Sequence, residues 1–249
     1  MTIVIFSSWL CTMIDSKIER RGKRGRKMLF RDRAEAGRRL GEVLRPVFGD
    51  RRDVVVLGLP RGGVAVGLEV ARRLRAPLDL LVVRKLGTPW FPEVAFGAVA
   101  SGGVRWIDHQ IVARYGLTPD VVARTVARAS RELAQREKLY LAGSERQPLT
   151  GRTVLLVDDG MATGSTMKAA VRALREHGPE LIVVAVPVAP VDTVASLHHL
   201  ADEIICLATP AHFQAVGEYY ADFTQVSDYE VLGMLSEPIQ TSRTNAPST

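Results

Sequence analysis

Continuous apolar runs rich in β-branched residues recur along this chain, and segments with helical spacing separate most of them. The runs include DVVVLGL from Asp53, LDLLVVRKL from Leu78, TVLLVDD from Thr153 and LIVVAVPVA from Leu181. Such runs are typical of strands that are buried on both faces of a sheet. Alternation of these strands with helices predicts βαβ units, and therefore an α/β fold with a mostly parallel sheet.

Local signals place the other elements. Asp32 followed by Glu35 resembles a capping box, which predicts that a helix begins there. A second helix is expected over about 64–74, and a third over 165–177. The stretch EVAFGAVASGGVRWID predicts two short strands around a glycine pair, and 118–141 reads as one long amphipathic helix.

The formal charge of +6 comes mostly from one short segment. Between Asp15 and Lys27 the chain has seven basic and two acidic residues, so the rest of the chain is close to neutral. A near-neutral body predicts no basic face and therefore no nucleic-acid partner. The basic segment itself is expected to be a solvated tail.

The 249 residues suffice for one large domain, which we expect over 28–236. Residues 1–27 are expected to be a disordered extension or the product of an upstream start, and 237–249 a disordered tail rich in Ser, Thr and Pro. The first fourteen residues are apolar but too short to cross a bilayer, so no stable membrane association is expected. Two cysteines, Cys11 and Cys206, do not make a disulfide framework, which fits a cytoplasmic protein.

The stretch VLLVDDGMATGSTM, 154–167, carries the clearest chemistry. Its small residues lie where a buried strand turns into a helix, and a helix N-terminus offers unpaired N–H groups to an anion. The spacing is not that of a Walker A loop or of a dinucleotide fingerprint. We expect a phosphate to bind this loop, whose residues are Gly160, Met161, Ala162, Thr163, Gly164, Ser165 and Thr166.

The adjacent acids Asp158 and Asp159 would repel an anion if they stood alone beside that loop. They are suited to accept hydrogen bonds from two vicinal hydroxyl groups, with metal-bound water able to share the site. A phosphate on one side and a diol on the other describe a ribose 5-phosphate. An acid pair that merely caps a helix is the alternative, and the Thr-Gly-Ser-Thr turn weighs against it.

This stretch resembles the phosphoribosyl pyrophosphate (PRPP) signature of the type I phosphoribosyltransferases. The resemblance covers roughly 30–235. It implies a doubly wound, mostly parallel α/β sheet with a small hood or C-terminal subdomain, and it implies a homodimer. It further implies attack of a nitrogen nucleophile on the ribose C1 of PRPP, with release of pyrophosphate and with Mg²⁺ held through water and PRPP oxygens near Asp158 and Asp159.

Other loops follow in the order that the resemblance implies. GLPRGGVAVG stands at the place of the pyrophosphate loop, where a strained or cis peptide bond is common in the family. VVRKLGTP ends the next strand with basic residues that would contact PRPP. The residues assigned to pyrophosphate are Pro60, Arg61, Gly62, Gly63, Arg84 and Lys85.

The remaining assignments concern catalysis and the acceptor. The segment around Trp90 takes the place of a mobile catalytic loop, and its Glu93 is a candidate to receive the proton of the nucleophile. Phe213, Tyr219 and Tyr220 are candidates to stack on an acceptor, whose identity the sequence leaves open. A protein that binds PRPP or a nucleotide as a regulator, with little catalysis, is the alternative function.

Overall fold

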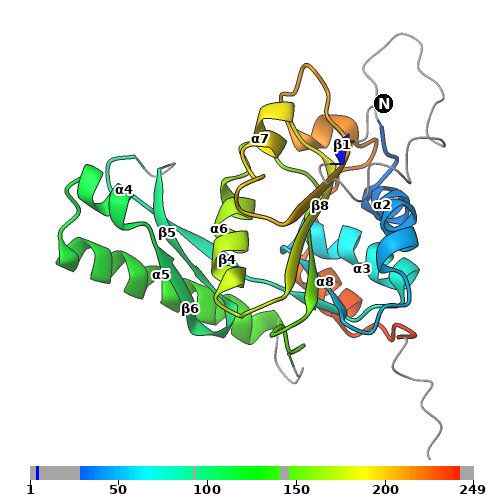
Figure 1. Ribbon diagram of the computed structural model, residues 1–249, viewed down its shortest axis with the longest axis horizontal. Coiled ribbons are helices and arrows are strands. Elements are labelled where there is room, and N and C mark those ends of the chain that lie inside the picture. Colours follow the sequence, from blue (N-terminus) through cyan, green and yellow to red (C-terminus); the bar gives the residue numbers. More distant parts are fainter. Residues whose placement is uncertain (1–3, 6–28, 92–93, 141–145, 242–249) are drawn as a thin grey trace, which may run out of the picture.

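The computed structural model describes residues 4–5, 29–91, 94–140 and 146–241. Two sheets organise the chain, a large central one and a smaller one that projects to one side (Figure 1). The central sheet has five parallel strands, with a two-residue strand antiparallel at one edge. Its strands, in spatial order, are β1 (Val4–Ile5), β9 (Glu203–Ala208), β8 (Leu181–Val188), β7 (Thr153–Val157), β2 (Val54–Gly58) and β3 (Leu78–Leu80).

Helices cover both faces of the central sheet. Val54 and Val56 of β2 pack with the helices α2 (Arg33–Phe48) and α3 (Gly62–Leu74). The alternate residues Val55 and Leu57 pack with α6 (Ser165–Arg175) and α7 (Val191–Ala195) on the other face. Every residue of β2 and of β7 is buried. The doubly wound α/β sheet predicted from the sequence is therefore confirmed.

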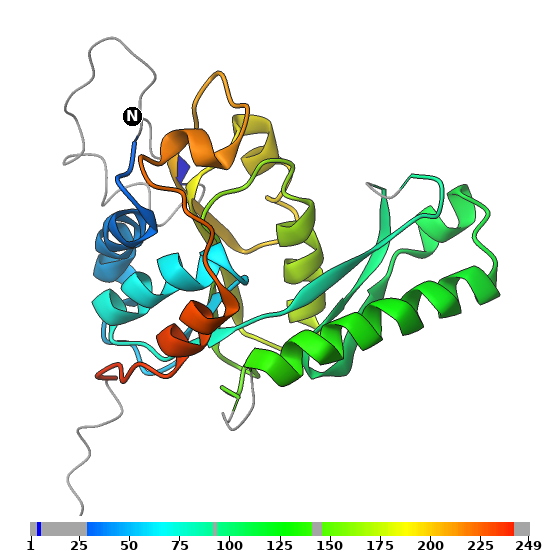
Figure 2. The same ribbon diagram turned by 180° about the vertical axis from the view of Figure 1, so that it is seen from behind.

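The smaller sheet and two helices form a projection that we call the arm, residues 83–140 (Figures 1 and 2). Its three antiparallel strands lie in the order β4, β5, β6, and a glycine turn joins the last two. The predicted long helix is present as α5 and lies along this sheet. The elements are β4 (Val83–Gly87), β5 (Ala95–Ala100), β6 (Val104–Ile107), α4 (His109–Arg114) and α5 (Pro119–Tyr140).

The run LDLLVVRKL does not form the single strand that was predicted. It supplies β3 to the central sheet and then β4 to the arm, with a change of sheet at Leu81 and Val82. The Leu81 N–H donates to Gly58 O of the central sheet, whereas the Val82 N–H donates to the Ser101 hydroxyl of the arm at 3.0 Å. An unbroken apolar run is compatible with a buried strand in either sheet. The run therefore did not indicate that the chain passes from one sheet to the other within it.

The start of α2 follows the predicted cap. The Asp32 carboxylate accepts the Glu35 N–H at 2.7 Å, as an N-cap should. The Glu35 carboxylate accepts the N–H of Arg31, one residue before the cap, so the reciprocal half of the capping box is shifted. Arg33 therefore occupies the first helical position, which directs its side chain toward the carboxyl ends of the strands, as described below.

After β9 the chain forms the short helix η2 (Val216–Tyr219) and then α8 (Asp228–Leu235), which packs against α3. Beyond α8, Glu237 forms an ion pair with Arg72, and Ile239 packs against the core. The basic segment and most of the apolar leader lie outside the described residues, as do residues 242–249. Among the helices described, none is long and apolar enough to cross a bilayer.

Candidate functional site

The two acids lie at the carboxyl end of β7, at the middle of the central sheet. The Asp159 N–H donates to Asp158 Oδ1 at 2.9 Å, and both residues are half-buried. Burial raises the pKa of Asp158 well above its usual value, and the neighbouring Asp159 charge raises it further. Two carboxylates so placed gain from hydroxyl donors or from a cation.

Arg33 is a member of the site that the sequence did not indicate. Its Nε donates to Asp159 Oδ2 at 2.7 Å, and its Nη1 donates to Thr224 O at 2.8 Å. The guanidinium carbon lies 3.9 Å from the centre of the Phe223 ring, and 12% of the side chain is exposed. Burial raises the pKa of Asp159, while the Arg33 guanidinium opposes that rise.

The three aromatic residues proposed to stack on an acceptor pack against other aromatic rings. The Tyr220 hydroxyl donates to Asp159 O at 2.6 Å, and its ring lies 5.4 Å from Phe30 and 5.0 Å from Phe223. Tyr220 is 3% exposed, so the structure places it as a support for Asp159. Tyr219 stacks on Phe213 at 5.4 Å and is also buried.

The glycine loop after β2 lies directly against the acid pair. A Cβ on Gly62 would come within 1.9 Å of Asp159 Oδ2, and one on Gly63 within 2.6 Å of Val157 O. Only glycine leaves room for that approach. The Pro60–Arg61 peptide bond is cis, which matches the unusual bond that the resemblance implied for this loop.

The basic residues assigned to pyrophosphate have different partners. Arg61 Nη1 lies 3.8 Å from Asp228 Oδ1 on α8, and the same carboxylate accepts the hydroxyl of Tyr140 at the end of α5. Arg84 Nη2 lies 3.6 Å from Glu132 Oε2 on α5. Lys85 follows on β4, and Arg84, Lys85 and Thr166 line one groove. The structure thus brings the basic end of β4 to the start of α6.

The small-residue loop after the acids is anchored at its middle. The Met161 N–H donates to Val188 O at 2.9 Å, and Ala162 O accepts the Thr193 hydroxyl at 2.6 Å. Gly164 has a φ of 69°, in the left-handed region, and α6 begins at the next residue. The hydroxyl groups of Thr163 and Ser165 lie 2.9 Å apart at this turn. The loop therefore presents hydroxyl groups and the first N–H groups of α6 at one place.

Two other observations concern the proton acceptor and a metal. Glu93, the proposed proton acceptor, lies outside the described residues. Within the ranges that the structure describes, no three His, Cys, Asp or Glu side chains come together as a metal site.

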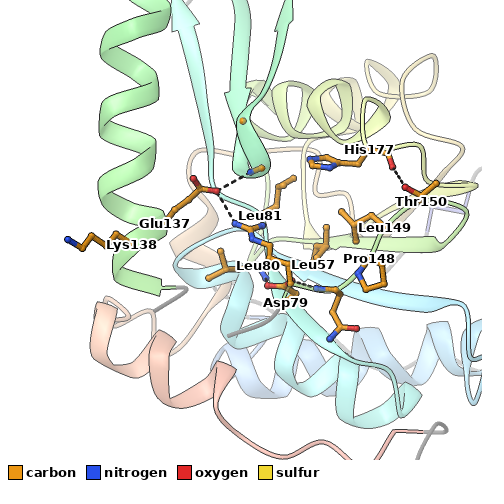
Figure 3. Close-up of a pocket in the computed structure, with 14 residues that line it drawn as sticks. Leu57, Asp79, Leu80, Leu81, Glu137, Lys138, Pro148, Leu149, Thr150 and His177 are labelled. Carbon is orange, nitrogen blue, oxygen red and sulfur yellow. Dashed lines mark hydrogen bonds and ion pairs between the residues drawn. The ribbon is translucent and has the colours of Figure 1, made fainter. Parts of the chain in front are cut away.

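A separate pocket of about 890 Å³ lies where the base of the arm meets the central sheet (Figure 3). Glu137 lines this pocket together with Gly102 and Arg146. Glu137 Oε1 accepts hydrogen bonds from the Gly102 N–H at 3.1 Å and from Arg146 Nη2 at 2.9 Å. Asp79 Oδ2 accepts the Gln147 N–H at 3.0 Å. The contact of Glu137 with Arg146 joins the arm to the segment that follows it, and neither Asp158 nor Asp159 lines this pocket.

Comparison with known proteins relates this geometry to a family. The model of the phosphoribosyl transferase domain family matches residues 34–223. Two proteins of Mycobacterium tuberculosis, from strains CDC 1551 and H37Rv, are each 50% identical over 207 residues and are provisionally named phosphoribosyl transferases. The match covers 83% of this chain and 46% of each relative, so the chain spans about half of their length.

A solved structure is also similar. The crystal structure of the Thermus thermophilus protein TT1426 has 44% sequence identity and a TM-score of 0.78. The similarity covers 84% of this chain and 98% of that one. The arm and the central sheet thus belong to an architecture that a homologous crystal structure shares.

Proposed function

The chain belongs to the phosphoribosyl transferase domain family, and from that membership we propose that it transfers the phosphoribosyl group of PRPP to a nitrogen nucleophile. In this reaction the bond between ribose C1 and pyrophosphate breaks, a bond from C1 to nitrogen forms, and pyrophosphate leaves. The observation that carries the proposal is the contact of Gly62 and Gly63 with the acid pair, next to the loop that starts α6.

Asp158 and Asp159 accept hydrogen bonds from the vicinal hydroxyl groups of the ribose in this proposal. The pKa of each carboxyl group is raised, chiefly because burial disfavours the charged form. Two hydroxyl donors stabilise the ionised pair and so repay part of that penalty. Arg33 and Tyr220 hold Asp159 from the other side, at its carboxylate and at its carbonyl oxygen.

The loop from Gly160 to Thr166 holds the 5-phosphate as the fixed end of the substrate. Its hydroxyl groups donate to phosphate oxygens, and the N-terminus of the eleven-residue helix α6 attracts the anion. Anchoring by Val188 and Thr193 keeps this end still while C1 moves toward the nucleophile.

Arg61, Arg84 and Lys85 stabilise the departing pyrophosphate. The transition state has oxocarbenium character, so negative charge develops on the leaving group and nearby cations lower the barrier. The nucleophile loses its proton as the C1–N bond forms, and Glu93 is the residue that we propose to accept it.

The acid pair also fits a magnesium ion, because Mg²⁺ prefers oxygen ligands and commonly binds one or two carboxylates together with substrate phosphates. Magnesium, when bound, neutralises charge on the pyrophosphate oxygens. Asp158 and Asp159 would hold the ion through water and PRPP oxygens. The family resemblance also makes us expect a homodimer, which the mass in solution would test.

A regulatory protein that binds PRPP without turnover is the second candidate. It is favoured by the packing of Phe213, Tyr219 and Tyr220 against neighbouring rings, since this leaves Tyr220 without an exposed ring face for an acceptor. Release of pyrophosphate from PRPP and Mg²⁺, measured across a panel of nucleobases and amines, separates the two functions. Saturable binding of PRPP with no release across that panel supports the regulator.

Calorimetry with PRPP and Mg²⁺ tests the site itself. The double variant Asp158→Asn with Asp159→Asn keeps the shape of both side chains and removes their charge, so we expect at least about 100-fold weaker PRPP binding. The control is Asp50→Asn with Glu180→Gln, two exposed acids in turns at the opposite ends of the strands. Normal PRPP binding by the first variant would show that the acids do not hold the ribose.

A further inference from the structure

A groove of about 1190 Å³ runs between strand β4 and helix α5 of the arm. Its inner end reaches Thr166, in the loop assigned to the 5-phosphate, and Trp90 lines its wall. Strand β4 lies at the edge of its sheet, so the groove follows a sheet edge with α5 as the opposite wall. Its α5 wall, from Val121 to Glu132, is about 16 Å long at the rise of an α-helix.

The charged residues that line the groove are mostly basic. Glu132 is the one acid among the described residues of its lining, and it pairs with Arg84. The five basic residues of the lining are Arg84, Lys85, Arg124, Arg128 and Arg131. Arg124 also forms an exposed ion pair with Asp120, whose Oδ2 lies 2.8 Å from Arg124 Nη2. The cations still outnumber the acids along the groove, which favours an anionic ligand.

This groove corrects the inference that the chain has no basic face. That inference used the net charge of the body, which averages over the whole surface. The helical spacing of Arg124, Arg128 and Arg131 places all three on one side of α5, where they meet the basic end of β4. The lining of this groove is therefore positively charged although the net charge of the body is close to zero.

Trp90 adds a second kind of contact. Trp90 is 66% exposed and lies next to Phe91, which is 58% exposed, so two large apolar residues stand together at the surface here. An exposed aromatic ring beside a row of cations is the combination that binds nucleotides, because the ring stacks on a base while the cations hold phosphates.

We propose that this groove binds a nucleotide-type ligand, with phosphates along Arg124, Arg128 and Arg131 and an aromatic base on Trp90. The ligand is either a free nucleotide or a segment of single-stranded nucleic acid, which share this chemistry. Because the groove reaches Thr166, the bound ligand lies next to the transfer site. Binding of this ligand is independent of the proposed function, whereas the further inference that the ligand is the phosphoribosyl acceptor rests on it.

Other occupants fit the groove less well. A second copy of the chain would bring its own basic groove, and the like charges would repel. An acidic peptide matches the charge but makes no particular use of the exposed indole. Competition by polyglutamate in the experiment below tests the acidic peptide.

The experiment measures the fluorescence anisotropy of a labelled ten-residue oligothymidylate, titrated with the full chain and without PRPP. All proteins carry four substitutions to glutamine in the basic segment near the N-terminus, so that this segment does not dominate binding. The residues replaced are Arg20, Arg21, Arg24 and Arg26.

Arg128→Ala with Arg131→Ala should weaken binding at least about tenfold and flatten its dependence on salt, because two phosphate contacts are lost. Trp90→Ala should weaken binding by about tenfold through loss of stacking. The matched control is Arg105→Ala with Arg114→Ala, which removes two exposed charges from the same arm outside the groove. The control should bind within about twofold of the parent, since long-range charge alone contributes little at 0.15 M salt.

Competition identifies the ligand source. Displacement of the oligonucleotide by ATP supports a free nucleotide, whereas resistance to ATP with tight oligonucleotide binding supports a strand. Equal displacement by inorganic tripolyphosphate or by polyglutamate overturns the proposal, because charge alone would then suffice. Failure of both the oligonucleotide and ATP to bind, or equal loss in the control variant, overturns it as well. None of these outcomes changes the calorimetric test of PRPP binding, so the two proposals fail separately.

Discussion

The body and the arm of this molecule place their charged side chains in different surroundings. In the body, β2 and β7 are buried at every position, and the acid pair is held by a glycine loop, Arg33 and Tyr220 from distant parts of the chain. In the arm, α5 buries only three of its 22 residues and turns most of its arginines outward. The body thus holds charge by close packing, whereas the arm displays it.

Glycine substitutions in the two regions provide the strongest contrast. A Cβ on Gly63 would collide with Val157 O at 2.6 Å, and one on Gly97 of β5 with Trp106 O at 2.4 Å. We expect each change to alanine to lower the free energy of unfolding by about 2 kcal/mol, because backbone atoms must move. Gly63→Ala should also abolish PRPP binding, whereas Gly97→Ala should retain it.

Urea denaturation measures the stability of both variants, and calorimetry measures their affinity for PRPP. Gly233→Ala is the control, since nothing lies within 4 Å of the added Cβ in α8. Equal loss of PRPP binding in the Gly63 and Gly97 variants would mean that the arm and the body do not act separately.

Arg33 allows a smaller and more specific test of the body. Arg33→Ala removes the ion pair to Asp159, so the pKa of Asp159 should rise and PRPP binding should weaken about tenfold near pH 6. Arg33→Lys keeps the charge but not the planar contacts with Thr224 O and Phe223, so it should fall between the alanine variant and the parent. The measurement is the pH profile of PRPP binding, which should shift to higher pH in Arg33→Ala; an unshifted profile would remove Arg33 from the site.

The pH dependence of stability gives the smallest expected effect. The pKa of Asp158 is raised in the folded chain, so the fold binds more protons than the unfolded chain above the ordinary value of 3.8. The free energy of unfolding should therefore fall as pH rises through the window between that value and the raised pKa. Asp158→Asn should reduce this fall, by much less than the cost of Gly63→Ala. Denaturation at pH 4 to 8 measures it, and identical slopes in both proteins would contradict it.

The sequence predicted the units of the body well, because its signals are local. The cap at Asp32 and the turn from β7 into α6 each depend on neighbouring residues, and the structure has both elements there. The break between β3 and β4 was missed, because it depends on which sheet supplies a partner, Gly58 or Ser101, to each half of one apolar run.

The site was only partly predictable for the same reason. The acids and the glycine loop stand out as motifs, whereas Arg33 is separated from Asp159 by 126 positions and looks like an ordinary residue in the first turn of a helix. The basic groove was readable in principle from the spacing of Arg124, Arg128 and Arg131. The sequence did not indicate where β4 lies, and the groove forms because β4 faces one side of α5.

The carboxylate of Asp228 is shared by two parts of the molecule. It lies 3.8 Å from Arg61 in the glycine loop and accepts the hydroxyl of Tyr140 where the arm helix ends. An anion bound at Arg61 would compete with Asp228 for the same guanidinium. Linkage between two sites is reciprocal, so if the anion at Arg61 changes the affinity of the arm for a ligand, that ligand changes the affinity of the loop for the anion by the same factor.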